Sequence, residues 1–210
     1  MAAKVKAMDP VDAAWYHMDG ATNLAMVTGV SLTSEPLDFE RVKAVYTHRL
    51  LPLERFRQRV VEIGLPYATP HWEEDPHFNI DDHFHHVALP EPRDKQALLD
   101  LLSDIASTPL DYRRPLWQVH VVDRVDGGSA MILRFHHCVG DGTAMMAIAQ
   151  LLFDDARNAP LERPAGKSRP PRAGLLDSLT RPVKRLLDQS AQAVSSGANL
   201  VLHPSQAAEL

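Results

Sequence analysis

Hydrophobic residues recur along the chain with two different periods, which separate the expected strands from the expected helices. Over residues 117–122, WQVHVV, apolar and polar side chains largely alternate, as they do in a half-buried strand. Residues 126–128, Asp-Gly-Gly, are a strong turn signal, and residues 129–135 form a second, more apolar strand. The pattern predicts an antiparallel hairpin whose second strand is central in a sheet.

Capping residues and spacing predict further elements ahead of this hairpin. An aspartate followed by proline is typical of a helix start and predicts a short helix over residues 9–16. Apolar residues at helical spacing predict two more helices, over residues 38–50 and 94–106. Residues 24–32 and 57–63 are rich in strand-forming side chains, so we expect a strand in each.

A polar break follows the hairpin and leads into an apolar segment. The break reads HHCVGDG over residues 136–142, and residues 143–153, TAMMAIAQLLF, are apolar almost all round. A helix without a polar face is typical of a buried element, so Met145 and Met146 are expected in the core. The predicted order is therefore strand, polar loop and buried helix.

Composition places the chain among ordinary globular proteins. Its 210 residues are 45% hydrophobic and 23% charged, which excludes wholesale disorder, collagen and coiled coil. The chain has no run of the roughly 18 apolar residues that a spanning helix needs, and its first ten residues lack the apolar core of a secretory signal. The single cysteine, Cys138, excludes an intramolecular disulfide and fits a reducing compartment. A cytoplasmic protein is expected.

Charge and proline content divide the chain into two regions. Residues 1–160 hold 15 Lys and Arg against 23 Asp and Glu, whereas residues 161–210 hold 7 against 4. The acidic body argues against nucleic acid as the main partner. Residues 159–172 are polar, basic and rich in proline, which is typical of a linker. We predict one domain over residues 1–158, followed by a linker and an amphipathic helical connection over residues 159–210.

The polar break carries the side chains best suited to catalysis. His136 and His137 stand where the second strand of the hairpin ends, and adjacent residues that leave a strand point in opposite directions. One ring is expected to face a cleft and the other to pack within the domain. A helix that begins near Gly142 would favour the neutral imidazole, which is the form that accepts a proton. Asp141 would hold the loop, and Gly140 and Gly142 would permit tight backbone angles there.

The pattern HHxxxDG between a strand and a buried helix resembles the signature of the coenzyme A-dependent acyltransferase superfamily, to which chloramphenicol acetyltransferase belongs. Three other segments resemble the bacterial wax ester synthase/diacylglycerol acyltransferase family within it. They are MDPVDAAWYHMD near the start, Pro115-Leu116-Trp117, and HWEEDPHFNIDDHFHHVALPEP, where Asn79 replaces the usual aspartate. The resemblance runs from about Met8 to Phe153.

This resemblance implies an O-acyltransferase that moves a fatty acyl group from acyl-CoA to a long-chain alcohol or a diacylglycerol, in wax ester or triacylglycerol synthesis. His137 would be the general base, without an acyl-enzyme, and His136 a supporting residue. Asp141 would be structural and bond to an arginine. Three further residues would lie on the substrate side: Gly142, Trp117 and Cys138. Acyl-CoA would be a co-substrate, and no other cofactor or metal is expected.

The resemblance also implies an α/β fold, a chloramphenicol acetyltransferase-like lobe with a mixed β-sheet flanked by helices. Enzymes of this kind have two such lobes with the catalytic histidine between them. The chain is therefore expected to be the N-terminal lobe, with residues 159–210 leading towards a second lobe that it lacks. Alone, it would have an open cleft and little or no activity.

Other interpretations of the same residues are less favoured. A zinc site at His83, His85 and His86 is disfavoured, because H-x-H-H is a poor ligand set for one tetrahedral ion. Cys138 is expected to be a plain buried cysteine rather than a nucleophile, and Trp117 is expected to be mainly a packing residue.

The basic tail leaves two alternatives open. Apolar residues at helical spacing within residues 176–187 could contact anionic lipid at the inner membrane or at lipid bodies, or could pack on a second lobe. For the whole chain, the alternative to an acyltransferase is a non-catalytic lipid-binding or scaffold lobe of the same fold. A peptide-forming condensation domain is a third possibility, but the PLW and N-terminal segments do not support it.

Overall fold

The computed structural model describes residues 5–64, 68–154, 156 and 159–161. The chain divides into two units, Met1–Ala165 and Gly166–Leu210. All of the described residues belong to the first unit. The helical connection predicted over residues 159–210 lies beyond Leu161 outside the described residues, so both it and the boundary at residue 158 stay predictions.

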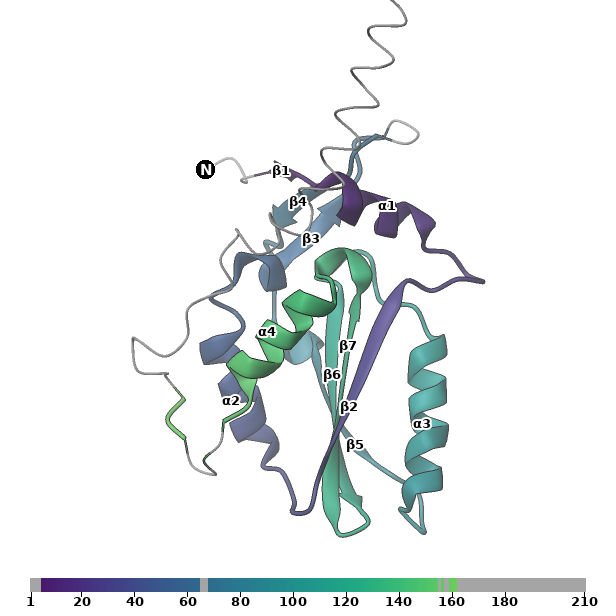
Figure 1. Ribbon diagram of the computed structural model, residues 1–210, viewed down its shortest axis with the longest axis vertical. Coiled ribbons are helices and arrows are strands. Elements are labelled where there is room, and N and C mark those ends of the chain that lie inside the picture. The colour runs from purple at the N-terminus through teal and green to yellow at the C-terminus, as the bar shows by residue number, and fades with distance from the viewer. Residues whose placement is uncertain (1–4, 65–67, 155, 157–158, 162–210) are drawn as a thin grey trace, which may run out of the picture. The chain divides into compact units, whose positions relative to one another are not determined.

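A mixed four-stranded sheet forms the centre of the first unit, in the order β2 (Met26–Thr33), β7 (Gly128–His136), β6 (Trp117–Val125) and β5 (Phe84–Ala88) (Figure 1). Strands β6 and β7 form the predicted antiparallel hairpin, and β7 also pairs antiparallel with β2. Strand β5 runs parallel to β6. The predicted hairpin and the central position of its second strand are thus confirmed.

Helices cover both faces of this sheet. Helices α2 (Phe39–Arg49) and α4 (Gly142–Leu152) lie on one side, and α3 (Lys95–Ser107) lies on the other (Figure 1). Because side chains alternate along a strand, β6 and β7 contribute to a separate core on each face. The core under α2 and α4 includes Tyr46, Trp117, Val119, Val121, Phe135 and Ile148. The core under α3 includes Leu98, Ile105, Val122, Ala130 and Ile132. The expected α/β fold with a mixed sheet flanked by helices is confirmed.

A second, smaller sheet lies beyond the end of the central sheet at which β7 finishes (Figure 1). Its strand order is β1 (Lys6–Ala7), β4 (His71–Glu74) and β3 (Gln58–Val61). Two 3-10 turns, Glu54–Arg57 and Ile80–Asp82, precede β3 and β5 respectively. The small sheet and the segments around it enclose a third core, to which Met8, Val60, Trp72, Leu116 and Cys138 contribute.

Helix α1 (Pro10–Met18) contacts the turn that follows β7. The Asp9 side chain accepts a hydrogen bond from the backbone N–H of Val11, as expected of an N-cap. Asp38 and Asp94 cap α2 and α3 in the same way, through the N–H groups of Arg41 and Ala97. The predicted helix starts are therefore confirmed.

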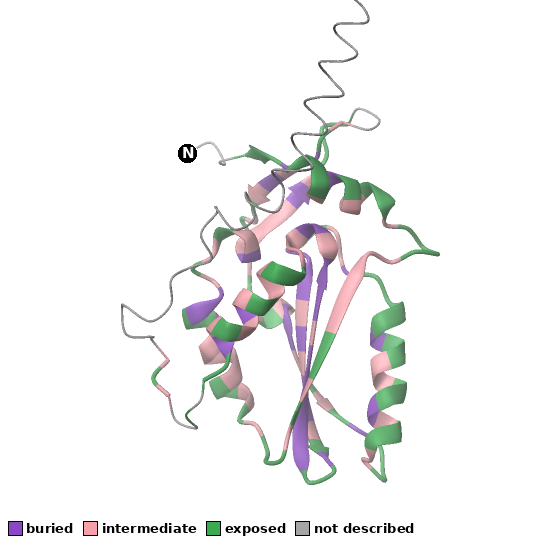
Figure 2. Ribbon diagram, in the orientation of Figure 1, coloured by how far each residue is buried: buried purple, intermediate pink, exposed green. Residues whose placement is uncertain are grey.

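The prediction that residues 143–153 form a buried helix is wrong in its burial. Most of α4 is exposed or half-buried (Figure 2). Only Ile148 and Leu152 of this helix are buried, whereas Met146 is 63% exposed. Phe153, directly after the helix, is 50% exposed. The helix is apolar on all sides, but within the described residues only one of its sides packs on the sheet and α2.

A buried arginine fastens the end of α4. Arg49 is only 5% exposed and donates hydrogen bonds to the carbonyl groups of Leu151, Leu152, Pro160 and Leu161. Its guanidinium also lies 2.7 Å from the Asp154 carboxylate. A cation at the carbonyl end of a helix is favourable, so Arg49 ties α2 to the end of α4.

Two histidines stack on the face of the sheet that carries α3. The rings of His85 and His120, on neighbouring strands, are 4.7 Å apart. Arg134, 2% exposed, donates a hydrogen bond to the carbonyl of Thr108 at the end of α3. Burial lowers the pKa of His120 to about 4, and the neighbouring His85 and Arg134 contribute to the shift. Both rings have buried Nε2 atoms without a hydrogen-bond partner in the part of the chain that the structure describes, so protonation of either ring is unfavourable.

Acid is therefore expected to destabilise the fold through His120. His120 takes up a proton near pH 6.5 in the unfolded chain but only near pH 4 in the folded chain. The free energy of unfolding therefore falls as the pH drops between these two values. Urea unfolding followed from pH 7 to pH 4 should show a shallower loss for His120→Gln than for the unaltered chain. The exposed His77→Gln variant should keep the original slope. Equal slopes in all three proteins would contradict this role of His120.

Gly128 is the one position in the hairpin where a side chain has no room. A Cβ atom there would lie 1.8 Å from the carbonyl oxygen of Thr33, a backbone atom that cannot give way. At Gly29, on the adjacent strand, the nearest atom would be 4.0 Å away. Gly128→Ala should lower the free energy of unfolding by about 3 kcal/mol or more, whereas Gly29→Ala should change it little. Similar urea midpoints for the two variants would refute the steric argument.

Candidate active site

The polar loop begins where β7 ends, and backbone hydrogen bonds hold it from both sides. The N–H of His136 donates to the carbonyl of Leu116 at 3.0 Å, and the N–H of His137 donates to the carbonyl of Ala25 at 2.8 Å. A 3-10 turn over His137–Val139 then carries the chain to α4. The backbone of each histidine is thus fixed by a hydrogen bond to a residue next to the end of a neighbouring strand.

His136 points into the domain. Its side chain is fully buried, and its Nδ1 accepts a hydrogen bond from the backbone N–H of Cys138 at 3.0 Å. The neutral ring therefore carries its proton on Nε2. That atom lies 3.7 Å from the carboxylate of Asp19. Burial lowers the pKa of His136, while the charge of Asp19 opposes this shift and His137 adds to it. His136 is thus held as a neutral, internal ring.

His137 leaves the chain in a different direction and packs against α1. Its ring stacks on the indole of Trp15, with 3.8 Å between the ring centroids and 20° between the planes. The side chain is half-buried, and its Nδ1 atom is buried without a hydrogen-bond partner among the described residues. Since Nδ1 is covered, Nε2 is the nitrogen left for a reacting group. Of the two rings, only that of His137 has a nitrogen that is neither buried nor hydrogen-bonded within the described residues.

Asp141 caps helix α4. Its carboxylate accepts hydrogen bonds from the N–H of Ala144 at 2.9 Å and from the hydroxyl of Thr143 at 2.7 Å. Burial raises the pKa of Asp141, but these bonds and the charge of His137 outweigh it and lower the pKa overall. The expected arginine partner is not among its hydrogen-bonded neighbours in the described residues. A helix start offers free N–H groups directly beside Asp141, and these satisfy the carboxylate instead.

The two glycines of the loop differ from the expectation that they supply unusual backbone angles. Gly140 has φ 178°, which any residue can adopt. What Gly140 provides is space, because a Cβ there would lie 3.0 Å from the Cβ of Ala144. At Gly142 a Cβ would meet nothing within 4 Å. The close approach in this loop is thus between Gly140 and the first turn of α4.

Trp117 and Cys138 do not reach the surface, so the expectation that they lie on the substrate side is not supported. Both side chains are 0% exposed. The Trp117 indole donates a hydrogen bond to the carbonyl of Phe56 at 2.8 Å and stacks on His83. Cys138 packs in the core beside Trp72 and Leu116. Both are packing residues, as their apolar character allows.

Four residues that surround the histidine pair were not singled out from the sequence. Trp15 stacks on His137, as described above. The rings of Tyr16 and Tyr112 lie 6.0 Å and 5.9 Å from that of His136. The Tyr112 hydroxyl donates to the carboxylate of Asp19. Trp15, Tyr16 and Asp19 belong to MDPVDAAWYHMD, so the resemblance of that segment was the signal that could have identified them.

A charged pair lies near this loop. The Arg55 guanidinium stacks over the ring of Trp72 at 3.6 Å, and its Nη1 atom is buried without a hydrogen-bond partner among the described residues. Burial raises the pKa of Asp12 to about 6, an effect that the charge of Arg55 opposes and the charges of Asp9 and Asp141 increase. Asp12 and Asp141 therefore act on each other electrostatically across the contact between α1 and the loop.

The five histidines between residues 71 and 86 do not gather into a ligand set. His83 packs on Trp117, His85 on His120, and His86 on Phe39. Across the part of the chain that the structure describes, no three His, Cys, Asp or Glu residues are arranged to hold a metal ion. In that same part, no helix is long and apolar enough to cross a membrane.

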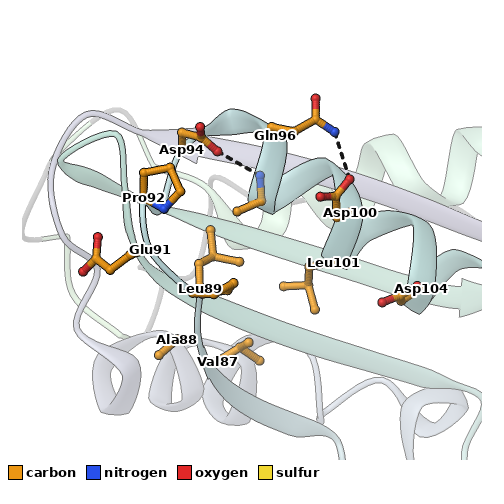
Figure 3. Close-up of a pocket in the computed structure, with 12 residues that line it drawn as sticks. Val87, Ala88, Leu89, Glu91, Pro92, Asp94, Gln96, Asp100, Leu101 and Asp104 are labelled. Atoms are coloured by element: carbon orange, nitrogen blue, oxygen red, sulfur yellow. Dashed lines mark hydrogen bonds between the residues drawn. The ribbon is translucent and has the colours of Figure 1, made fainter.

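A groove of about 430 Å³ lies apart from the histidine pair, between the end of β5 and α3 (Figure 3). Its floor is apolar, and four carboxylates stand around it: Glu91, Asp94, Asp100 and Asp104. Asp94 is already engaged as the cap of α3. The groove contains none of the loop residues, so it is not part of the candidate active site.

Comparison with known proteins identifies the family. Residues 8–209 match the wax ester synthase/diacylglycerol acyltransferase catalytic domain. The chain belongs to this family. It is 30% identical over 211 residues to tgs3 of Mycobacterium tuberculosis, named as a probable diacylglycerol O-acyltransferase, covering 94% of this chain and 76% of tgs3.

Two solved structures show the fold. The wax ester synthase/diacylglycerol acyltransferase from Marinobacter aquaeolei VT8 superimposes with a TM-score of 0.60 at 23% identity, over 89% of this chain and 47% of that enzyme. The first condensation domain of the calcium-dependent antibiotic synthetase gives 0.58 at 16% identity, over 71% and 37%. The expected chloramphenicol acetyltransferase-like architecture is thus confirmed. The chain spans about half the length of the Marinobacter enzyme.

The environment of Cys138 predicts an unreactive thiol. Burial is the main cause that raises its pKa, and the carboxylate of Asp12 adds to the effect. Because the thiolate is the reactive form, a disulfide reagent at pH 8 should modify Cys138 at least 100-fold more slowly in the folded chain than in urea. The released chromophore measures this directly. Labelling at comparable rates in both states would show that the loop around Cys138 opens readily.

Proposed function

We propose that this chain carries the catalytic histidine of an O-acyltransferase that moves a fatty acyl group from acyl-CoA to a long-chain alcohol or a diacylglycerol. The observation that carries the proposal is the division between the two histidines. His136 is buried with Nδ1 engaged, whereas His137 makes no side-chain hydrogen bond within the described residues and keeps Nε2 for a substrate. Family membership supplies the reaction class.

In the proposed reaction, Nε2 of His137 takes the proton of the acceptor hydroxyl. The oxygen attacks the thioester carbonyl carbon, and a tetrahedral intermediate forms. The C–S bond then breaks, the ester is released, and the CoA sulfur leaves with the proton that the imidazole gives back. No acyl-enzyme is needed. General-base catalysis of this kind contributes a factor of about 10²–10⁴ to the rate, and alignment of the two substrates supplies much of the rest.

Asp141 supports the imidazolium that forms in this reaction. The charge of His137 contributes to the lowered pKa of Asp141, so the two groups attract each other when the ring is protonated. The carboxylate remains bonded to Ala144 and Thr143. Asp141 thus assists through space while it caps α4.

The second lobe of the enzyme is part of the proposal. Helix α4 begins one residue after Asp141 and has an apolar outer side, on which Met146 is 63% exposed. An exposed apolar side of this kind is typical of an interface. Since the Marinobacter enzyme is about twice as long as this chain, we propose that a second lobe covers α4 and completes the substrate tunnel.

Acyl-CoA would be the donor substrate, and no cofactor takes part in the scheme. Because both substrates carry long apolar chains, we propose that the enzyme works at a membrane or lipid-body surface as a peripheral protein of the cytoplasm. We propose no nucleic-acid partner for this enzyme.

One observation favours the alternative of a non-catalytic, lipid-binding or scaffold lobe. A general base is usually oriented through its second ring nitrogen, but Nδ1 of His137 has no hydrogen-bond partner within the described residues. In the proposed enzyme, stacking on Trp15 supplies this orientation instead.

Activity measurements separate the two functions. The intact enzyme, with its second lobe, is supplied with acyl-CoA and hexadecanol or a diacylglycerol, and released CoA thiol is measured. His137→Ala should lower kcat by about 10²–10⁴-fold, whereas His136→Ala should lower it less. His77→Ala, at an exposed histidine, should leave it unchanged.

The outcomes are distinct. Unchanged turnover in His137→Ala would rule out the general-base mechanism. Absence of thiol release by the unaltered protein with its second lobe present, together with binding of acyl-CoA, would favour the lipid-binding alternative.

A further inference from the structure

Asp19 lies beside His136 and is nearly withdrawn from solvent. It directly follows α1, and its side chain is 9% exposed. Neither carboxylate oxygen contacts a lysine or an arginine among the described residues. A buried carboxylate without a cation is costly unless neutral donors satisfy it, so its contacts indicate what it holds.

One set of contacts closes the loop that leads into β2. The Asp19 carboxylate accepts a hydrogen bond from the backbone N–H of Ala25 through Oδ1, and one from the Tyr112 hydroxyl through Oδ2. Inside the loop, the backbones of Gly20 and Asn23 pair through two hydrogen bonds of 3.1 and 2.9 Å. Ala25 is therefore held at the base of a short loop, which is closed both by its hydrogen bond to Asp19 and by the Gly20–Asn23 pair.

The same residue holds the backbone of His137. The carbonyl of Ala25 accepts the hydrogen bond from the N–H of His137 at 2.8 Å. Asp19 and His137 thus bind the two sides of one residue, Asp19 through the N–H of Ala25 and His137 through its carbonyl. Movement of Ala25 would shift the backbone that carries the proposed base.

The oxygen of Asp19 that accepts from Ala25 also faces His136. This atom, Oδ1, lies 3.7 Å from Nε2 of His136, the nitrogen that carries the proton in the neutral ring. This separation is too long for a hydrogen bond, and Nε2 has no hydrogen-bond partner among the described residues, so Asp19 acts on this end of the ring through its charge alone. Asp19 therefore acts on the side chain of one histidine and on the backbone of the next.

We propose that Asp19 is the positioning residue of the histidine pair: its carboxylate faces the His136 ring, and it holds the His137 backbone through Ala25, whose N–H it binds and whose carbonyl binds His137. The proposal deepens the proposed function, since His137 is the base in it, but the hold on His137 can be measured without turnover. A displacement of about 1 Å at a catalytic group costs about 100-fold in rate, so the effect on kcat is expected to be large.

The direct test is hydrogen exchange at the His137 amide of the full chain, read by NMR or by mass spectrometry. Asp19→Ala should speed exchange there at least 10-fold. In Asp19→Asn, an amide oxygen can still accept from Ala25, so exchange should stay within about 3-fold of the unaltered chain. Asp9→Ala removes an aspartate that caps the other end of α1, and it should leave exchange at His137 within about 2-fold.

Turnover supplies the second readout. In the enzyme with its second lobe, Asp19→Ala should lower kcat for thiol release about 10- to 100-fold, with KM for acyl-CoA changed less than about 3-fold. Asp19→Asn should recover most of kcat, and Asp9→Ala should keep it. A residue that only stabilised the fold would not show this split or this recovery.

The result that overturns the proposal is unchanged exchange at His137 in Asp19→Ala, or equal acceleration in Asp9→Ala. If Asp19→Ala does not fold, Asp19→Glu takes its place, because it keeps the charge but moves the carboxylate by one methylene. Exchange at His137 should then rise at least 10-fold, and unchanged exchange would again refute the proposal. Fast exchange in a protein that has no transferase activity at all would support the positioning role and refute the proposed function.

Discussion

Two adjacent side chains at the end of a central strand cannot share one environment, and the rest of the candidate site depends on this constraint. Strand β7 is paired on both sides, and the hydrogen bonds from His136 to Leu116 and from His137 to Ala25 extend this hold just past its end. The backbone therefore has no freedom to exchange the two rings. The ring of His136 lies in the core, and the ring of His137 packs against Trp15 of α1.

Buried polar groups mark the places where separate segments of the chain meet. Arg49 joins α2 to the end of α4, Arg134 joins β7 to the end of α3, and Asp19 joins α1 to β2. Each costs desolvation and makes at least one hydrogen bond to a backbone group, which has a fixed place in the fold. Such groups add little net stability. What they contribute is a defined arrangement of elements, and at Asp19 that arrangement includes the histidine pair.

The architecture is that of one lobe of the wax ester synthase/diacylglycerol acyltransferase family. Within the described residues the sheet is covered on both faces, but α4 is covered on one side only. Helix α4 also begins at the loop that carries His137 and Asp141. The apolar side that the lobe leaves open therefore adjoins the residues to which we assign chemistry, which is the arrangement expected if a second lobe closes over a substrate held there.

Local patterns in the sequence determined the elements and the loop. Period-two alternation set the β6–β7 hairpin, aspartate caps set the starts of α1, α2 and α3, and HHxxxDG located the histidines, because each of these signals lies within a few residues of what it specifies. Tertiary structure decided the rest. The exposure of Met146, the burial of Trp117 and the approach of Asp19 to His136 all depend on which segments dock together. Residues 19 and 136 are far apart along the chain, and no local period records that a carboxylate and an imidazole will meet.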